Sequence, residues 1–293
     1  MRVFVTGAAG FIGTATTKEL IANGHEVVGL ARSDANAAAL TKLGAKVHKG
    51  SLEDLDSLRK GAKETDGTIH LAFIHDFSKF AENGQIDKRA IDAMGGVLEG
   101  SGKPFIVTSG TLLIAPGRLG TEEDPVQPGL PRMSETAGLA FAPKGVRAMA
   151  VRLPQVHGGD GKCGLVNWLL TTAKEKGVSA YIGDGGNRWS AAHRLDVARL
   201  YRLALEKGEA GRSFHAVADE GVTARDIAEI IARHVKVPTR SITPDEAPAH
   251  FGFMAMFAGL DGAASSALTQ KWLGWKPTQI GMIADISRPG YFG

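Results

Sequence analysis

The 293-residue chain has few of the features that would place it in a membrane or in an oxidising compartment. It contains one cysteine, Cys163, which cannot form an internal disulfide and excludes a zinc site built from several cysteines. Uncharged stretches such as Pro104–Gly117 and Ala247–Leu260 reach 14 residues and include glycine and polar residues. A membrane-spanning helix needs roughly 18 or more apolar residues, so the sequence argues against an integral membrane protein.

Strong charge of one sign is also missing. The formal net charge is +3, and lysine and arginine form no dense run that would mark a nucleic-acid surface. The first residues, MRVFVTG, are typical of a strand and lack the charged, apolar and cleavage regions of a signal peptide. We expect a cytoplasmic protein without a membrane or nucleic-acid partner. No cluster of His, Asp and Glu has metal-ligand spacing, so we expect no metal site.

Short runs of β-branched residues alternate with helical patterns through the first half of the chain. Strands separated by helices of about 10–15 residues indicate parallel crossovers, and therefore an α/β doubly wound parallel sheet with helices on both faces. The predicted strands are Val3–Thr6, Glu26–Ala31, Lys46–Lys49, Thr68–Phe73, Pro104–Ser109 and Ala148–Leu153, and the predicted helices are Thr14–Asn23, Ala35–Leu43, Leu52–Gly61 and Gln85–Glu99.

The pattern changes after about Gln155, where glycine, asparagine, tryptophan and proline become frequent. Helices predicted at Gly164–Lys176, Arg194–Lys207 and Thr223–Val235 are joined there by irregular segments. We therefore expect a nucleotide-binding domain over residues 1–154, to which residues 191–217 return. Residues 155–190 and 218–293 are expected to form a smaller, partly interleaved C-terminal lobe that binds a small-molecule substrate.

The segment Thr6–Gly13, TGAAGFIG, lies where the first predicted strand leads into the first helix. A dinucleotide diphosphate binds backbone N–H groups at a helix amino end when no side chain stands between them. Gly7 allows the tight turn, Gly10 lets the backbone approach the phosphates, and Gly13 lets the helix pack closely on the sheet. The strand–turn–helix context favours a dinucleotide site over a glycine-rich surface turn. The other residues expected to line it are Thr6, Ala9, Phe11 and Ile12.

The end of the second predicted strand distinguishes the two forms of the cofactor. An NAD-binding site places an acidic residue there, which accepts hydrogen bonds from the adenosine ribose. This chain has Ala31 at that point, followed by Arg32 and Ser33. A guanidinium beside the ribose suits a 2′-phosphate, and Ser33 adds a hydroxyl. We therefore predict NADP(H) in preference to NAD(H), while a solvated loop charge is the alternative for Arg32.

With these motifs, the chain resembles the short-chain dehydrogenase/reductase superfamily, in particular its extended or atypical branch of NAD-dependent epimerase/dehydratases. The resemblance includes, besides the glycine turn, the segments Gly50–Leu52, His70–Ala72, Val107–Ser109, Val151–Gly158, His193–Asp196 and Leu273–Pro277. It implies a Rossmann-type fold, an adenine pocket at Ser51 and Leu52, and a homodimer. It also implies that the rest of the cofactor contacts Leu71, Ala72, Phe73, Thr108, Ser109, Pro154 and Val156.

The catalytic motif of that superfamily is missing from this chain. Its members carry a tyrosine and, four residues later, a lysine that lowers the tyrosine pKa, so that the phenol exchanges a proton with a carbonyl or alcohol. Here those two positions fall near Gln127 and Pro131, and neither side chain can do this. The three tyrosines, Tyr181, Tyr201 and Tyr291, have no lysine at that spacing.

Other groups would then have to act on the substrate. Ser109 and Thr111 follow the fifth predicted strand, where a hydroxyl could polarise a carbonyl, although capping of the strand end explains them equally well. His157 is the first candidate for a general acid, because the unperturbed pKa of histidine lies near neutrality. A neutral histidine that bonds a loop carbonyl is the alternative for His157.

Several further residues have two interpretations. His75 and Asp76 could form a dyad that faces the substrate, or Asp76 could cap the next helix. Arg132 and Glu135 have the spacing of an ion pair at the surface or between the lobes. Arg132 could also supply charge near the nicotinamide ribose. The segments that could bind substrate are Asn187–Arg188 and the aromatic and methionine-rich Phe251–Phe257, which could equally be core.

Three functions fit these observations. The leading hypothesis is an NADP(H)-dependent oxidoreductase that moves hydride to or from a small carbonyl or alcohol substrate. A nucleotide-sugar epimerase or dehydratase is the alternative within the same family. A non-catalytic, redox-responsive protein that binds NADP(H) is the alternative of a different class, and the incomplete catalytic set supports it.

Overall fold

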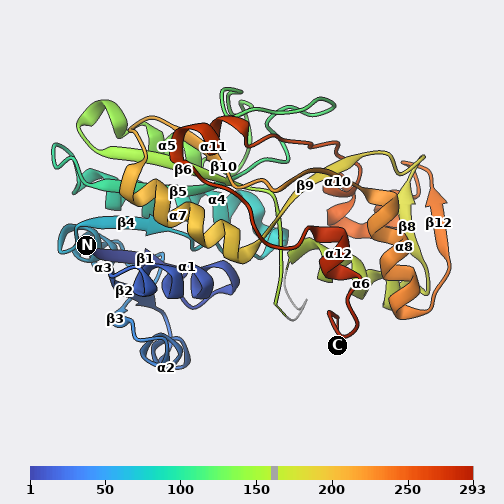
Figure 1. The fold of residues 1–293 in the computed structure, drawn as a ribbon, viewed down its shortest axis with the longest axis horizontal. Coiled ribbons are helices and arrows are strands. Elements are labelled where there is room, and N and C mark those ends of the chain that lie inside the picture. Colours follow the sequence, from blue (N-terminus) through green and yellow to red (C-terminus); the bar gives the residue numbers. More distant parts are fainter. Residues whose placement is uncertain (160–163, 293) are drawn as a thin grey trace.

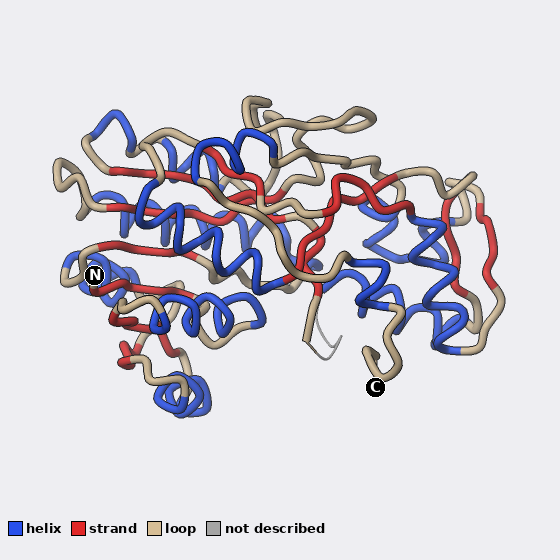
Figure 2. Tube along the Cα trace, viewed as in Figure 1, coloured by secondary structure: helices blue, strands red, loops and turns tan. Residues whose placement is uncertain are grey.

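The computed structural model describes residues 1–159 and 164–292, so Cys163 lies outside the described residues. A large sheet covered by helices lies beside a smaller lobe (Figures 1 and 2). The main sheet has the strand order β10-β6-β5-β4-β1-β2-β3, and all neighbouring strands are parallel. This order confirms the predicted Rossmann-type doubly wound fold. The strands are β1 (Arg2–Thr6), β2 (Glu26–Ala31), β3 (Lys46–Lys49), β4 (Gly67–His70), β5 (Pro104–Gly110), β6 (Arg147–Leu153) and β10 (Ser213–His215).

Helices cover both faces of the main sheet, because successive residues of a strand point to opposite faces. In β1, Val3 and Val5 join one hydrophobic core and Phe4 joins the other. No helix within the described ranges is long and apolar enough to span a membrane. The first face carries α1 (Phe11–Ala22), α2 (Asp34–Lys42), α7 (Arg194–Lys207) and α11 (Ala267–Leu273), and the second carries α3 (Leu55–Lys63), α4 (Phe80–Gly96) and α5 (Ser134–Leu139).

The smaller lobe has two sheets of its own, which lie to the right of the main sheet in Figure 1. One has the order β11-β9-β7, and the other pairs β12 with β8. These strands are β7 (Gln155–His157), β8 (Ser179–Ile182), β9 (Arg188–His193), β11 (Asp219–Thr223) and β12 (Thr239–Ile242). The remaining helices are α6 (Gly164–Lys176), α8 (Ala224–Val235), α9 (Ala247–Phe251), α10 (Ala255–Ala258) and α12 (Met282–Ile286), with the short 3₁₀ helices η1 (Phe77–Lys79), η2 (Ala142–Lys144) and η3 (Gly252–Met254).

Local hydrogen bonds move several elements away from their predicted boundaries. The helix predicted to begin at Leu52 begins at Leu55, because Asp54 accepts a hydrogen bond from the Ser57 N–H (3.0 Å) and caps it. The strand predicted to continue to Phe73 ends at His70, after which the Ala72 N–H donates to the Thr6 hydroxyl (3.2 Å). The chain therefore leaves the main sheet directly beside the glycine turn.

Candidate cofactor and active site

The glycine turn joins β1 to α1 in a conformation that other residues would not adopt freely. Gly7 has a φ of +69°, and a Cβ there would lie 2.8 Å from the Ala72 nitrogen. A Cβ on Gly13 would lie only 1.9 Å from the Gly7 carbonyl oxygen. On Gly10, by contrast, the Gly7 oxygen at 3.1 Å is the one atom within 4 Å of an added Cβ, among the described residues. Gly10 therefore faces open space at the amino end of α1.

This end of α1 is able to bind an anion. Gly10 precedes the helix without a side-chain cap, and the N–H groups of Phe11, Ile12 and Gly13 have no acceptor in the described part of the chain. The positive end of the helix dipole lies at the same place. Ala9 is half-buried beside the turn and adds no polar group that would compete for these donors. The shape and the donor set fit a dinucleotide diphosphate.

A cation that we did not predict lies over this helix end. Arg194, the first residue of α7, has its Cζ 5.1 Å from the centroid of the Phe11 ring. A Cβ on Gly159 would meet the Arg194 guanidinium at 3.0 Å, and the buried Nε has no hydrogen-bond partner among the described residues. The signal for Arg194 in the sequence was its place in the His193–Asp196 motif. No periodicity or spacing linked it to the glycine turn, which ends 181 residues earlier at Gly13.

Among the described residues at the end of β2, Arg32 has no ion-pair partner, whereas the nearby carboxylate of Asp34 is already paired. Ala31 is buried, and Arg32 is exposed and forms no ion pair with a described residue. Asp34 bonds to the Lys49 amine (3.0 Å). The Ser33 hydroxyl accepts a hydrogen bond from the Asn36 N–H (3.2 Å) and so caps α2. Arg32 is therefore the group at this edge that remains available for a phosphate.

The residues of the expected adenine pocket form a turn after β3. The Ser51 hydroxyl accepts from the Glu53 N–H (3.3 Å), so it stabilises the turn. Leu52 is partly buried and packs against the core beneath α3 and α4. These contacts leave both side chains partly exposed, and their contact with adenine stays a prediction.

A buried chain of hydrogen bonds starts at the glycine turn and crosses the carboxyl end of the main sheet. The Thr6 hydroxyl lies 2.7 Å from His70 Nδ1, and His70 Nε2 lies 3.0 Å from Asp87 Oδ1. The Ser134 hydroxyl donates to Asp87 Oδ2 (2.5 Å), and Arg132 Nε donates to the Ser134 oxygen (2.9 Å). Burial raises the pKa of Asp87, but the bond from His70 and the charges of His70 and Arg132 outweigh it and hold that pKa below its ordinary value.

Arg132 is stacked on a residue that was expected to line the cofactor. Its Cζ lies 4.3 Å from the centroid of the Phe73 ring, and its Nη2 donates to the Thr108 carbonyl oxygen (2.9 Å). Phe73 follows Leu71 and Ala72 at the end of β4, and all three are partly exposed.

The predicted ion pair of Arg132 with Glu135 is wrong. Glu135 instead faces β6 and binds the Arg152 guanidinium, with an Nη2–Oε1 distance of 2.6 Å.

The hydroxyl groups at the end of β5 have different surroundings. Thr108 Oγ1 donates to the His70 carbonyl oxygen (2.7 Å) and is fully engaged within the core. Thr111 is buried and hydrogen-bonded to Ser190 (2.9 Å), which argues against its expected role on a substrate. Ser109 is partly exposed and forms no side-chain hydrogen bond to a described residue. Of these three residues, Ser109 has the accessible hydroxyl.

His157 ends β7 of the small lobe and is buried against the C-terminal helix α12. Its Nδ1 lies 2.7 Å from Asp285 Oδ2 in α12, and the residue is 2 % exposed. Pro154 and Val156, which precede it, are buried and partly buried. A buried ring bonded to a carboxylate is not accessible to a substrate, so the position argues against the general acid that we expected. The partner is also a carboxylate rather than the loop carbonyl of the alternative interpretation.

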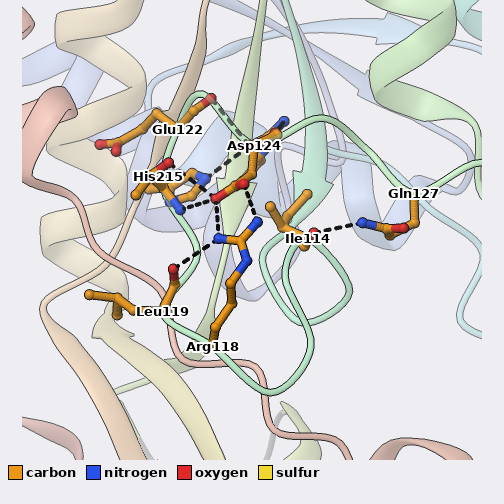
Figure 3. A network of polar contacts seen from close by, with 9 residues as sticks. Ile114, Arg118, Leu119, Glu122, Asp124, Gln127 and His215 are labelled. Atoms are coloured by element: carbon orange, nitrogen blue, oxygen red, sulfur yellow. Dashed lines mark hydrogen bonds and ion pairs between the residues drawn. The ribbon is translucent and has the colours of Figure 1, made fainter.

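Two of the three tyrosines are held in structural contacts. Tyr201 is fully buried, its hydroxyl lies 2.8 Å from Thr108 Oγ1, and burial raises its pKa well above the ordinary value. Tyr291 accepts a hydrogen bond from the Gly158 N–H (3.3 Å) in the small lobe. Gln127, at the expected tyrosine position, donates to the Ile114 carbonyl oxygen (3.0 Å), as Figure 3 shows. The Gln127 side chain thus holds its own loop, next to the Arg118–Asp124 ion pair.

The remaining predicted pairs have structural partners. Asp76 accepts from the Ser78 N–H (3.1 Å), so it caps η1 as the second of the two interpretations proposed. Asn187 donates to the carbonyl oxygens of Ala258 and Leu260. The Arg188 guanidinium binds both carboxylate oxygens of Asp261, at 2.9 and 2.8 Å. Asn187 and Arg188 therefore join β9 to the segment after α10, and neither is free to bind a substrate.

Three comparisons with known proteins agree with this geometry. A model of the NAD dependent epimerase/dehydratase family matches residues 3–97. An uncharacterized protein of Schizosaccharomyces pombe is 49% identical over 295 residues, which cover 100% of both chains. The decarboxylating sterol-4-alpha-carboxylate 3-dehydrogenase of Dictyostelium discoideum is 28% identical over 255 residues, 76% of this chain and 73% of that one.

A solved structure has the same fold over the whole chain. The dTDP-glucose 4,6-dehydratase of Streptomyces venezuelae, with NAD and TYD bound, is similar with a TM-score of 0.79 at 20% identity, and the match covers 100% of this chain and 96% of that one. The family model covers the strand, turn and helix that form the anion site. That match includes the nucleotide site, the Schizosaccharomyces pombe relative extends over the full length, and the Dictyostelium discoideum dehydrogenase is similar over 76% of this chain. The chain therefore belongs to the NAD-dependent epimerase/dehydratase family and is an NAD(P)-dependent enzyme of the oxidoreductase type.

Proposed function

We propose that the protein is an NADP(H)-dependent oxidoreductase that moves hydride to or from a small carbonyl or alcohol substrate. The observation that carries the proposal is the pair of free donors on the nucleotide domain. No described side chain caps the amino end of α1 at Gly10, and none forms an ion pair with Arg32 at the end of β2. When bound, the cofactor supplies or takes up the hydride. The residues of the chain have to hold it, orient it and bind the reacting oxygen.

The proposed cofactor site extends along the carboxyl edge of the main sheet. We assign the diphosphate to the N–H groups of Phe11, Ile12 and Gly13, with Arg194 as an additional cation. Arg32 is assigned to the adenosine 2′-phosphate. The domain division that this requires has residues 1–154 and 191–217 on the cofactor side, and residues 155–190 and 218–293 on the substrate side.

The side chains between the two parts of the molecule favour a small apolar substrate over a sugar nucleotide. Phe73 and Phe80 of the cofactor side have ring centroids 6.0 Å apart, and Phe80 lies 6.4 Å from Phe257 of α10. A sugar nucleotide carries two further phosphates and requires cations from the substrate side. Two arginines of that side are already paired with carboxylates, Arg188 with Asp261 and Arg240 with Glu246. The aromatic rings therefore support a substrate without phosphate groups.

The cofactor preference is tested by titrating NADPH and NADH into Arg32→Ser. A charge-assisted hydrogen bond contributes roughly 1.5–3 kcal/mol, and solvent screening at this exposed site reduces it to about 1–2 kcal/mol. We expect about 10-fold weaker NADPH binding and no change for NADH. The matched control is Arg59→Ser, which removes an exposed arginine of α3 that pairs with Asp56. Equal NADPH affinity in Arg32→Ser and the wild type would show that Arg32 does not contact the phosphate.

The reaction is tested by NADPH oxidation with a panel of aliphatic and aromatic aldehydes and ketones. Turnover of aldehydes or ketones supports the proposal. Saturable NADPH binding without oxidation over the whole panel would instead favour the non-catalytic, redox-responsive protein. Turnover of a nucleoside-diphosphate sugar, with oxidised cofactor retained through purification, would favour the epimerase or dehydratase.

A further inference from the structure

Arg132 carries a positive charge that no carboxylate of the described residues neutralises by direct contact. Within the described ranges it forms no ion pair, and it reaches Asp87 only through the Ser134 hydroxyl. Its Nη2 is bonded to the Thr108 carbonyl oxygen, whereas Nη1 forms no hydrogen bond to a described residue. The residue is partly exposed, and Nη1 is not among the described side-chain atoms that are buried without a hydrogen-bond partner. A partly buried guanidinium with a free donor is well suited to bind a negatively charged or strongly polar oxygen.

The position of Arg132 brings this donor to the reacting end of the proposed site. Thr108 lies near the carboxyl end of β5, at the edge where doubly wound sheets bind their ligands. The Thr108 side chain points toward Tyr201 of α7, so the side chain of Ser109 points to the opposite face, which α5 covers. Arg132 immediately precedes α5 on that face. The accessible hydroxyl of Ser109 and the free donor of Arg132 therefore belong to the same corner of the sheet.

Neighbouring side chains hold Arg132 in place, and the nearby His75 does not add a second positive charge. Phe73 stacks on the guanidinium, and the ring of His75 lies 5.6 Å from that of Phe73. Desolvation, followed by the charge of Arg132, lowers the pKa of His75, which therefore stays neutral at pH 7. The Phe73 ring is also the first of the aromatic series that continues through Phe80 to Phe257. An apolar wall thus begins directly at the charged group.

On the basis of the proposed function, we propose that Arg132 is a catalytic residue. It stabilises the negative charge that develops on the substrate carbonyl oxygen, and the aromatic series holds an aromatic or apolar group attached to that carbonyl. The carbonyl carbon gains the hydride of the reduced cofactor, the C–O π pair moves to the oxygen, and the oxygen then takes a proton from water. Arg132 keeps its proton throughout and acts as a hydrogen-bond donor to the oxygen. It would take the place of the tyrosine that other members of the superfamily carry and that we do not find in this chain.

The test is the binding of benzoate and benzamide to the full chain, measured by calorimetry with and without NADP⁺. Benzoate presents a negatively charged oxygen on an aromatic ring, and benzamide has nearly the same shape without the charge. We expect the wild type to bind benzoate at least 10-fold more tightly than benzamide. Arg132→Met should abolish this preference, because the ring contacts remain and the cation is lost. Arg132→Lys should retain part of it.

The matched control is Arg147→Met. Arg147 also donates to backbone carbonyl oxygens, those of Leu205 and Gly208, but it lies at the start of β6, the opposite end of the main sheet. This variant should keep the full preference for benzoate. Thermal unfolding of each variant checks that the fold is retained. If Arg132→Met does not fold, Arg132→Lys and the preference of the wild type decide the outcome.

The outcomes separate this inference from the proposed function. A wild type that binds benzoate no better than benzamide, or an Arg132→Met protein that keeps the preference, overturns the role of Arg132 even if aldehydes are reduced. If aldehydes are reduced, kcat should fall at least 100-fold in Arg132→Met and be partly restored by added guanidinium. A chain that prefers benzoate through Arg132 but oxidises no NADPH with any carbonyl retains the oxyanion site and refutes the proposed reaction.

Discussion

Adding one methyl group at two glycines of the same turn should have opposite consequences. In Gly13→Ala the new Cβ would lie 1.9 Å from the Gly7 carbonyl oxygen and 2.8 Å from its carbon, far inside the 3.0 Å limit of real contacts. Both atoms are backbone, so α1 has to move away from β1. Overpacking of this kind costs about 1–3 kcal/mol, and the backbone contact puts Gly13→Ala near the upper limit. A loss of about 3 kcal/mol lowers the Tm by roughly 5–10 °C.

Gly10→Ala should leave the fold almost unchanged. Its methyl group would meet the Gly7 oxygen at 3.1 Å and no other described atom within 4 Å, so the methyl occupies the space in front of the α1 N–H groups. We expect a Tm within about 1 °C of the wild type and at least 10-fold weaker NADPH binding, since the phosphates can no longer approach the helix end. Calorimetric unfolding and NADPH titration of both variants measure the contrast. Equal NADPH affinity in Gly10→Ala and the wild type would refute the assigned phosphate position.

Two further predictions concern buried groups of the cofactor domain. Tyr201→Phe should lower the free energy of unfolding by about 1 kcal/mol, because the hydrogen bond between the phenol and the Thr108 hydroxyl is lost. It should leave kcat unchanged, because the phenol is fully buried in the core, and a 100-fold fall in kcat would contradict this. Burial lowers the pKa of His215 to about 4. The negative charge of Glu122 opposes this shift, and the positive charge of Arg152 adds to it. The neutral ring contributes about 3 kcal/mol to the stability of the fold above pH 6.5. This contribution is lost progressively as the pH falls from 6.5 through 4, because the histidine of the unfolded chain takes up its proton first. The stability of His215→Gln should therefore depend less on pH in this range, and an equal slope would show that His215 is not responsible.

The sequence predicted the strand, turn and helix around the glycines because that unit is local. The glycines at Gly7, Gly10 and Gly13 act within one turn, and strand and helix patterns on either side placed them correctly. Each of these features depends on backbone sterics and short spacing, which a single sequence records.

The catalytic half depended on contacts between distant segments, which spacing does not reveal. His157 looked accessible in sequence, but its partner Asp285 is 128 residues away. Thr111 is buried for a similar reason, because Ser190 of β9 covers its hydroxyl. The partner of Arg132 could not be chosen from helical spacing either, since the chain before α5 turns toward β5 and Phe73. Tertiary packing therefore decided which polar groups remained free.

The proposed function requires that an adenine dinucleotide lies with its diphosphate against the amino end of α1. This binding mode is tested by isothermal titration of NADPH into the full chain and into Gly10→Val, with NADH as the second ligand. We predict saturable binding to the wild type, tighter for NADPH than for NADH, and no measurable heat from either cofactor with a folded Gly10→Val protein. Unchanged binding to Gly10→Val, or no binding of either cofactor to the wild type, would contradict the claim.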